Sequence, residues 1–225
     1  MYWLFNSSIG RKFIMSISGI FLILFLLFHM SMNLTLLLPD DGKVYDMICE
    51  FLGANWYAVV GTLILAAGVG VHIVYASMLT LQNMKSRGSD KYLSSNRTKT
   101  EWAAKNMFVL GLIIALGLVI HLWNFWYQMQ FAELMGRPDA VTGGSGLVKE
   151  LFSSIPYVVI YLVWLGALWF HLTHGVWSAF QTIGLSGKIW YPRLKMISNI
   201  VSTLIVICFA AIPVYFLAVH LLYNL

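Results

Sequence analysis

Five long runs of apolar residues dominate the sequence, and polar positions gather between them. The runs cover residues 13–38, 56–82, 104–130, 154–183 and 196–222. Each exceeds the roughly 20 residues that an α-helix needs to cross the hydrocarbon core of a bilayer. Backbone groups in hydrocarbon need internal partners, and the runs lack the alternation of membrane barrel strands. They are therefore predicted to be membrane-spanning helices.

The first run follows Arg11 and Lys12, as the apolar part of a signal peptide would. It is longer than such a segment, and no small-residue cleavage site follows it. We therefore expect a retained helix.

Composition excludes a water-soluble globule. Of the 225 residues, 60% are hydrophobic and only 10% are charged, against roughly 25% charged residues in soluble proteins. Five spans and short loops use the whole length, so we predict a single all-α transmembrane domain over residues 1–225, without a soluble catalytic domain. Cys49 and Cys208 have neither disulfide-framework nor metal-ligand spacing.

Charged residues divide unequally between the two sides of the predicted bundle. Five helices place the N-terminus and the loops at 83–103 and 184–195 on one side. That side carries the basic residues Arg11, Lys12, Lys85, Arg87, Lys91, Arg97, Lys99, Lys105, Lys188, Arg193 and Lys195. The other side carries Lys43, Arg137 and Lys149. Cytoplasmic loops are enriched in Lys and Arg, so the N-terminus is predicted to be cytoplasmic. The net charge of +5 then reflects membrane topology and not nucleic-acid binding.

All six histidines fall within predicted spans. They are His29, His72, His121, His171, His174 and His220. An ionisable side chain is costly inside a bilayer, which makes each one a candidate functional group. A single such histidine has an ordinary explanation, a hydrogen bond to a neighbouring helix. The positions of the six histidines, taken together, indicate a shared function.

Helix direction and the rise of about 1.5 Å per residue place the histidines at two depths. The first and third helices run outward and put His29 and His121 in the outer half of the bilayer. The second and fourth helices return and put His72, with His171 or His174, in the inner half. Two pairs of imidazoles, each from two helices, are what bis-histidine ligation of two b haems requires. We therefore expect four of the helices to form a haem-binding bundle.

Small residues lie one helical turn from several of these histidines, at Gly68, Gly117, Ala167 and Gly175. A broad porphyrin approaches a helix more closely where neighbouring side chains on that face are small. His29 is the exception, because Phe25 precedes it by four residues. His174 has larger neighbours at the same spacing, so His171 is favoured as the ligand. His174 is then a possible hydrogen-bond donor to a haem propionate.

Short segments in this order carry a family resemblance over nearly the whole chain. They are Ser16-Ile-Ser-Gly19, His29-Met-Ser-Met-Asn33, Gly70-Val-His72, Trp102 and His171-Leu-Thr-His-Gly-Val-Trp-Ser178. With the chain length and helix count, they resemble the dihaem cytochrome b membrane anchor of succinate:quinone oxidoreductases. These are the succinate dehydrogenases and fumarate reductases with a single five-helix anchor.

The resemblance implies which residues bind the two haems. His72 and His171 would hold the inner haem, and His29 and His121 the outer one, as the depths also predict. Ser16 and Trp102 match positions that look like propionate contacts. Hydrogen bonding of Ser16 to its own helix and an interfacial position for Trp102 are the ordinary alternatives.

The resemblance also implies partners and a substrate. A flavoprotein subunit and an iron–sulfur subunit would dock on the cytoplasmic face of a bacterial inner membrane, and the whole complex can dimerise. Menaquinone is the expected quinone. Some fumarate reductase anchors carry a Glu, resembling a proton conduit, two residues before the ligand of the fourth helix. Here that residue is Trp169, so such a path is not expected.

A quinone exchanges protons together with electrons, so its site needs a polar group that protons can reach. The candidates are Asn33, one turn beyond His29, Glu50 in an outer loop, and His220 near the outer end of the last helix. Each also has an ordinary explanation. Asn33 suits a helix cap, Glu50 a solvated loop, and His220 an interfacial side chain.

Three other protein classes use histidines in membranes. The cytochrome b anchor of a hydrogenase or a formate dehydrogenase is a rival of the same kind. A proton transporter that relays protons through histidines is a rival of another kind and predicts no bound chromophore. A membrane di-iron oxygenase needs several close histidine clusters, and His171 and His174 are the only close pair in the sequence.

Overall fold

The computed structural model describes residues 7–87, 102–185 and 187–223. Five of its helices are long and apolar enough to cross a membrane. They are α2 (Ser8–Leu34), α4 (Trp56–Arg87), α5 (Trp102–His121), α8 (Ile155–Thr182) and α9 (Trp190–Tyr223). No strand occurs in the described ranges. The predicted all-α fold with five candidate spans is therefore confirmed.

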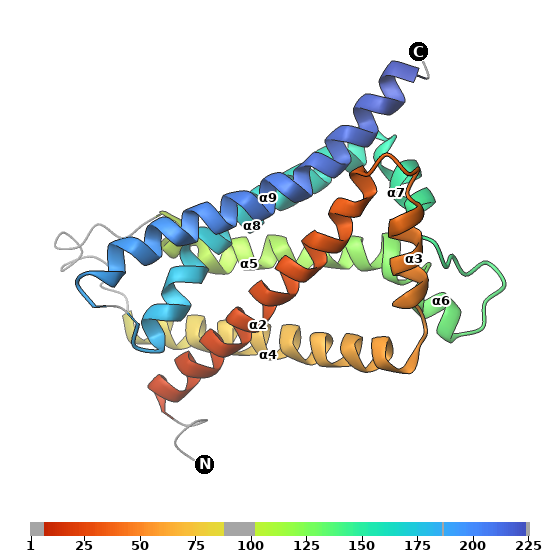
Figure 1. Cartoon of the computed structure of the whole chain (residues 1–225). Helices are drawn as coiled ribbons and strands as arrows, with labels where there is room; N and C mark the ends of the chain where they lie inside the picture. Colours follow the sequence, from red (N-terminus) through yellow and green to blue (C-terminus); the bar gives the residue numbers. More distant parts are fainter. Residues whose placement is uncertain (1–6, 88–101, 186, 224–225) are drawn as a thin grey trace.

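The long helices form one bundle in which α2 crosses the others obliquely (Figure 1). α8 packs most extensively against α9 and α5, while α4 packs mainly against α2. α8 therefore lies at the centre of the bundle, and α4 lies at its edge.

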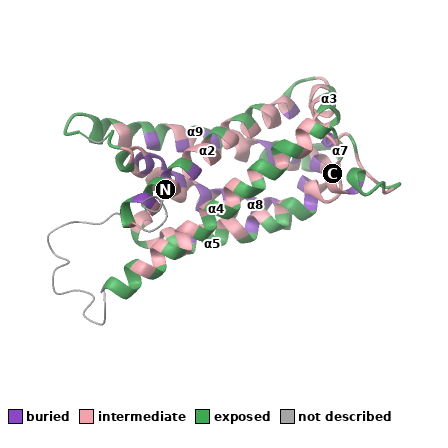
Figure 2. Ribbon diagram, turned by 90° about the horizontal axis from the view of Figure 1, so that it is seen from below, coloured by how far each residue is buried: buried purple, intermediate pink, exposed green. Residues whose placement is uncertain are grey.

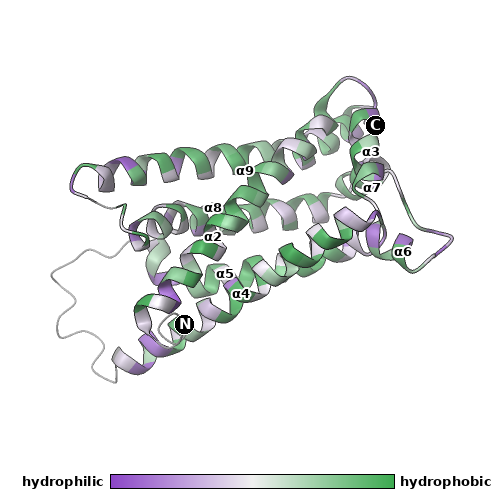
Figure 3. Cartoon of the chain, turned by 60° about the horizontal axis from the view of Figure 1, so that its bottom comes forward, coloured by the Kyte–Doolittle hydropathy of each residue, from purple (hydrophilic) through white to green (hydrophobic). Residues whose placement is uncertain are grey.

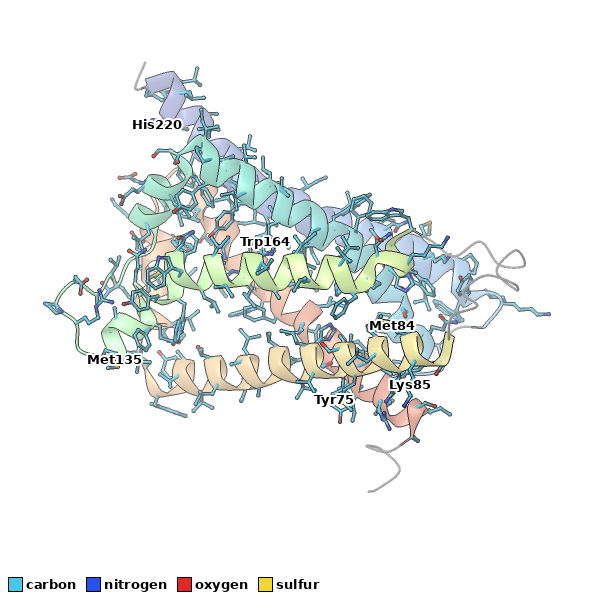
Figure 4. All side chains as sticks on the ribbon, turned by 180° about the vertical axis from the view of Figure 1, so that it is seen from behind. Tyr75, Met84, Lys85, Met135, Trp164 and His220 are labelled. Carbon is cyan, nitrogen blue, oxygen red and sulfur yellow. The ribbon has the colours of Figure 1, made fainter. Side chains whose placement is uncertain are left out.

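Basic residues gather at one end of the bundle, which also carries hydrophilic residues in Figure 3. This basic end holds the start of α2 with Arg11 and Lys12, the end of α4 with Lys85, the start of α5 with Lys105, and the turn into α9 with Lys188, Arg193 and Lys195. Lys91, Arg97 and Lys99, which belong to the same predicted side, lie outside the described residues. Lys85 and His220 lie at opposite ends of the bundle (Figure 4).

The opposite end, called the far end below, carries short helices where the sequence suggests loops. They are η1 (Thr35–Leu37), α3 (Lys43–Phe51), α6 (Gln130–Leu134) and α7 (Ser145–Phe152). The Asp46 carboxylate caps α7 by accepting hydrogen bonds from the Ser145 N–H at 2.8 Å and its hydroxyl at 2.7 Å. Gly42 precedes α3 with φ of 88°, where a Cβ would lie 2.6 Å from Ser145 Cβ. This contact and the positive φ both favour glycine.

The predicted single helix over residues 104–130 is wrong in one respect. α5 ends at His121 and continues as the π-helix η3 (Leu122–Trp126), in which the Tyr127 N–H donates to the Leu122 carbonyl at 2.8 Å. A π-helical turn inserts one extra residue and changes the direction of the side chains that follow. It buries Asn124, whose Nδ2 donates to the Tyr161 hydroxyl at 3.2 Å.

Two apolar clusters form the core. One lies at the far end and contains Leu36, Val148, Phe152, Val158, Tyr161, Ile212 and Phe216. The other lies mainly between α8 and α9 and contains Leu165, Leu168, Leu172, Val176 and Ile205. The most apolar part of α4 buries no residue within the chain, and most of α4 is exposed in Figure 2. An apolar helix with such a surface suits contact with lipid or with another subunit.

Candidate paired-histidine sites

The inner pair consists of His72 on α4 and His171 on α8. Their ring centroids lie 6.3 Å apart and the ring planes make an angle of 67°. The two residues are 99 positions apart in the sequence. They meet because α4 and α8 belong to the same bundle. The structure thus joins the two residues that depth and the small neighbours of His171 predict for the inner site.

The outer pair consists of His29 on α2 and His121, the last residue of α5. Their ring centroids lie 5.9 Å apart with a plane angle of 87°. This is the second pair that depth predicts. His174, the alternative on α8, packs its ring against Trp177 at a centroid distance of 4.8 Å.

Both pairs suit axial ligation of a haem iron in donor type and spacing. A metal–imidazole nitrogen bond is about 2 Å long, so two nitrogens on opposite sides of one iron lie about 4 Å apart and their ring centroids about 6 Å apart. The observed 5.9 Å and 6.3 Å agree with this spacing. Among the described residues, no group of three or more His, Cys, Asp or Glu side chains comes together as a metal site. Two axial ligands suit a metal that a macrocycle already coordinates.

Hydrogen bonding to neighbouring helices does not explain why two of the four paired histidines are buried. His121 Nδ1 and His171 Nδ1 are buried and have no hydrogen-bond partner in the chain. A buried polar atom without a partner costs roughly 1–3 kcal/mol. The ordinary explanation for a histidine in a membrane helix, an interhelical hydrogen bond, therefore leaves Nδ1 of both rings unexplained.

Aromatic rings surround the outer pair. Phe25 stacks on His29 with centroids 5.4 Å apart and a plane angle of 15°, and Phe209 lies 5.8 Å from the same ring. His121 contacts Phe125 at 5.2 Å and Trp164 at 5.7 Å. The residues come from α2, η3, α8 and α9, so the orientation of the outer rings depends on aromatic packing between helices.

The inner pair has polar and backbone neighbours instead. Ser18 Oγ lies 3.2 Å from His72 Nδ1. A Cβ at Gly19 would lie 3.5 Å from His72 Cε1, and one at Gly111 would lie 3.8 Å from His171 Cε1. The backbones of α2 and α5 therefore stand close to the edges of these two rings.

The small residues near the histidines have different surroundings from those predicted. A Cβ at Gly68 would lie 2.5 Å from the Phe21 ring, and one at Gly117 would overlap the Trp164 indole. At these positions the glycine admits an aromatic ring from a neighbouring helix. Gly175 has no heavy atom within 4 Å of such a Cβ, so only this glycine of the three leaves its surface open.

The two predicted propionate contacts lie near the basic end. Ser16 is buried, and its hydroxyl donates to the Lys12 carbonyl at 3.0 Å, which is the ordinary bonding of Ser within a helix. Trp102 is 59% exposed at the start of α5 and packs against Phe170 at a centroid distance of 5.0 Å. Trp169, at the position of the family's Glu, donates from Nε1 to Thr203 Oγ1 at 2.9 Å.

The three quinone-site candidates have different environments. Asn33 Nδ2 donates to the His29 carbonyl at 2.7 Å, and Glu50 is exposed on α3. His220 lines a cavity of about 480 Å³ at the far end. Its other lining residues include Pro39, Asp41, Lys149, Ser153 and Tyr215. Of the three, His220 is the candidate that faces a cavity.

An ion pair stands at the edge of this cavity. Lys149 Nζ donates to the Asp41 carboxylate. This hydrogen bond and the charge of Lys149 hold the pKa of Asp41 below its usual value. The cavity therefore combines apolar walls with a charged rim.

Three residues near the pairs were not among the predicted site residues. Ser18 contacts His72, and Asn124 and Tyr161 form a buried hydrogen bond beside His121. Ser18 lies within a predicted span, where a polar side chain is unusual, and in the segment Ser16-Ile-Ser-Gly19 of the family resemblance. The burial of Asn124 follows from the π-helix.

Comparison of the chain with models of protein families, with curated proteins and with solved structures gives no match.

Proposed function

We propose that the chain is the haem-binding membrane anchor of a complex of the succinate dehydrogenase and fumarate reductase type. The observation that carries the proposal is the meeting of four histidines from four helices in two pairs, with ring centroids 6.3 Å and 5.9 Å apart. A chain with one functional histidine and several structural ones has no need of this arrangement. The family resemblance supports the kind of complex.

Each haem would be held by its histidine pair. His72 and His171 would bind the inner haem through one neutral ring nitrogen each, and His29 and His121 the outer one. Bound haem b supplies one-electron oxidation and reduction. The helices contribute position and an apolar surrounding, which keep water away from the rings and influence the reduction potential.

The basic end would face the cytoplasm and receive the other subunits. Positive residues at the starts of α2 and α5, at the end of α4 and at the turn into α9 support this orientation. A flavoprotein and an iron–sulfur subunit docked there would carry the dicarboxylate chemistry. The exposed apolar surface of α4 suits lipid or a second copy of the complex.

The cavity at the far end is the proposed quinone site. The ring nitrogens of His220 and the hydroxyl group of Tyr215, which also lines the cavity, are groups that can form hydrogen bonds with a quinone. The apolar walls, including Phe216 and Val219, suit a quinone ring. Asn33 is less suited, because its amide is bound to its own helix. Protons would enter from the outer face.

Electron donors test the proposal and its rivals. We expect succinate, added to membranes that contain the chain with its co-purifying subunits, to reduce a b-type haem, and fumarate to oxidise it again. Reduction by hydrogen or formate alone would assign the chain to the rival anchors. Absence of any haem spectrum would favour the proton transporter. The variant His220→Gln should keep both haems while slowing their oxidation by menaquinone.

A further inference from the structure

The contact between Ser18 and His72 joins α2 to α4 at the inner pair. Ser18 is buried, with 7% of its surface exposed. Its Oγ lies 3.2 Å from His72 Nδ1 and donates a hydrogen bond of 3.0 Å to the Met15 carbonyl. Ser18 on α2 thus places its hydroxyl group beside one ring nitrogen of His72 on α4.

The direction of the hydrogen bond between Ser18 and His72 decides which ring nitrogen of His72 carries the proton. A serine hydroxyl has one proton and accepts through its oxygen. The 3.0 Å contact with the Met15 carbonyl favours donation of that proton to the carbonyl. The oxygen would then accept a hydrogen bond from His72 Nδ1, and Nδ1 would carry the ring proton. A neutral imidazole has a single N–H, and Nε2 therefore keeps its lone pair.

The backbone of α2 holds the same edge of the ring. A Cβ at Gly19 would lie 3.5 Å from His72 Cε1 and 3.9 Å from Nδ1. The Nδ1–Cε1 edge therefore lies against Ser18 and Gly19. A rotated ring would lose the hydrogen bond to Ser18.

The other paired rings lack this arrangement. His121 Nδ1 and His171 Nδ1 are buried without a hydrogen-bond partner. Asn33 Nδ2 lies 3.4 Å from both ring nitrogens of His29, but it belongs to the same helix and donates to the His29 carbonyl. Among the described residues, only Ser18 brings a polar atom from another helix to a paired ring.

We infer that Ser18 is a positioning residue for the inner haem, which fixes the proton of His72 on Nδ1 and leaves Nε2 to ligate the iron. The inference rests on the proposed function, because Nε2 is a ligand only if the chain binds haem. A hydrogen bond from Nδ1–H to oxygen makes the ligating nitrogen more basic. A more basic ligand favours ferric over ferrous iron and lowers the reduction potential of the inner haem.

Four variants of the full chain test this role. Ser18→Ala removes the hydroxyl, while Ser18→Thr and Ser18→Val have the same shape as each other and differ in the hydroxyl. Ser31→Ala is the matched control, because Ser31 lies on the same helix and its hydroxyl donates to the Leu27 carbonyl at 2.8 Å. Each protein is purified from membranes for haem quantification and for a redox titration that resolves the two midpoints.

We expect the alanine and valine variants to raise one midpoint and leave the other unchanged. The ferric-to-ferrous equilibrium of the inner haem should change by up to about tenfold, which is about 59 mV for one electron. The same haem should be retained up to about tenfold less tightly. Ser18→Thr and Ser31→Ala should match the original chain.

Three results would overturn the inference. They are unmoved midpoints in the valine variant, an equal shift in the valine and threonine variants, and an equal shift of both haems. If the alanine variant fails to accumulate, the threonine and valine pair gives the same comparison. An original chain without haem contradicts the proposed function as well, whereas a chain with two haems and unmoved midpoints contradicts only the role of Ser18.

Discussion

The inner and outer histidine pairs are held by different kinds of contact. At the inner pair, the Ser18 hydroxyl contacts His72, and the backbones at Gly19 and Gly111 stand beside the ring edges. At the outer pair, aromatic rings from several helices pack around His29 and His121. Both arrangements orient an imidazole through contacts with neighbouring helices. A hydrogen bond selects a ring nitrogen, whereas aromatic packing sets a ring plane, so the two sites should respond to different substitutions.

Replacing the paired histidines should have the largest effect. We expect His72→Ala or His171→Ala to remove the proposed inner haem, and His29→Ala or His121→Ala the proposed outer one, because each haem would lose one of the two histidines that would hold it. Haem per chain should fall to about half in each case, with loss of a different midpoint for the two pairs. Haem extraction and redox titration measure both.

His174→Ala is the control for these replacements, because it removes another histidine of α8 whose ring packs against Trp177. It should retain both haems. Loss of haem equal to that of His171→Ala would contradict the assignment of the inner pair.

Adding one methyl group beside each pair tests how tightly the helices pack around it. In Gly117→Ala the new Cβ would overlap the Trp164 indole, which packs against His121 and donates to the Ile114 carbonyl at 3.0 Å. Trp164 lies between α8 and α5 (Figure 4). Overpacking of this kind costs about 1–3 kcal/mol, and the outer midpoint should move. Unfolding in mixed micelles measures the free energy.

Gly175→Ala provides the matched substitution near the inner pair. A Cβ there meets no heavy atom of the chain within 4 Å, so the free energy of unfolding of the chain should stay unchanged. Equal destabilisation by the two alanines would contradict the described packing of Trp164.

Loss of the buried hydrogen bond beside the outer pair should change the free energy of unfolding by a comparable amount. Tyr161→Phe leaves Asn124 Nδ2 without its acceptor, and a buried donor without a partner costs about 1–3 kcal/mol. Tyr157→Phe, one turn earlier on α8 and 38% exposed, should change the free energy of unfolding far less. Equal values for the two phenylalanine variants would show that the hydrogen bond contributes nothing.

The ion pair at the far-end cavity should have the smallest effect, one that depends on pH. Lys149 lowers the pKa of Asp41 in the folded chain, so the carboxylate stabilises the fold above its unfolded pKa of about 3.9. The stabilisation is lost as pH falls through the lower folded pKa. Asp41→Asn should therefore be slightly less stable than the original chain at neutral pH and equal to it in strong acid. A difference that grows towards acid pH would contradict the pairing.

The spans and the histidine pairs could be predicted because they follow from solvent and geometry. A bilayer requires long apolar helices, and the fixed rise of a helix converts residue number into depth. Residue number therefore indicated that His29 meets His121 and that His72 meets His171 or His174, and the small neighbours of His171 favoured that residue. Rotation of each helix about its axis does not follow from depth, and the structure alone reveals the Ser18 contact.

Other features depend on contacts that an apolar pattern does not encode. The run after His121 is rich in aromatic residues and has no proline or glycine up to residue 130, so nothing in it indicates the π-helix. The glycines at 68 and 117 suited a porphyrin equally well in the sequence, but Phe21 and Trp164 cover them. The short helices of the far end depend on partners distant in the sequence, such as Asp46 and Ser145.

A reduced-minus-oxidised absorption spectrum of the purified chain, with haem quantified per polypeptide, tests the central claim most directly. We expect two b-type haems per chain, one for each histidine pair. One haem would contradict the pairing of four histidines. A purified, folded chain without haem would contradict the proposed function.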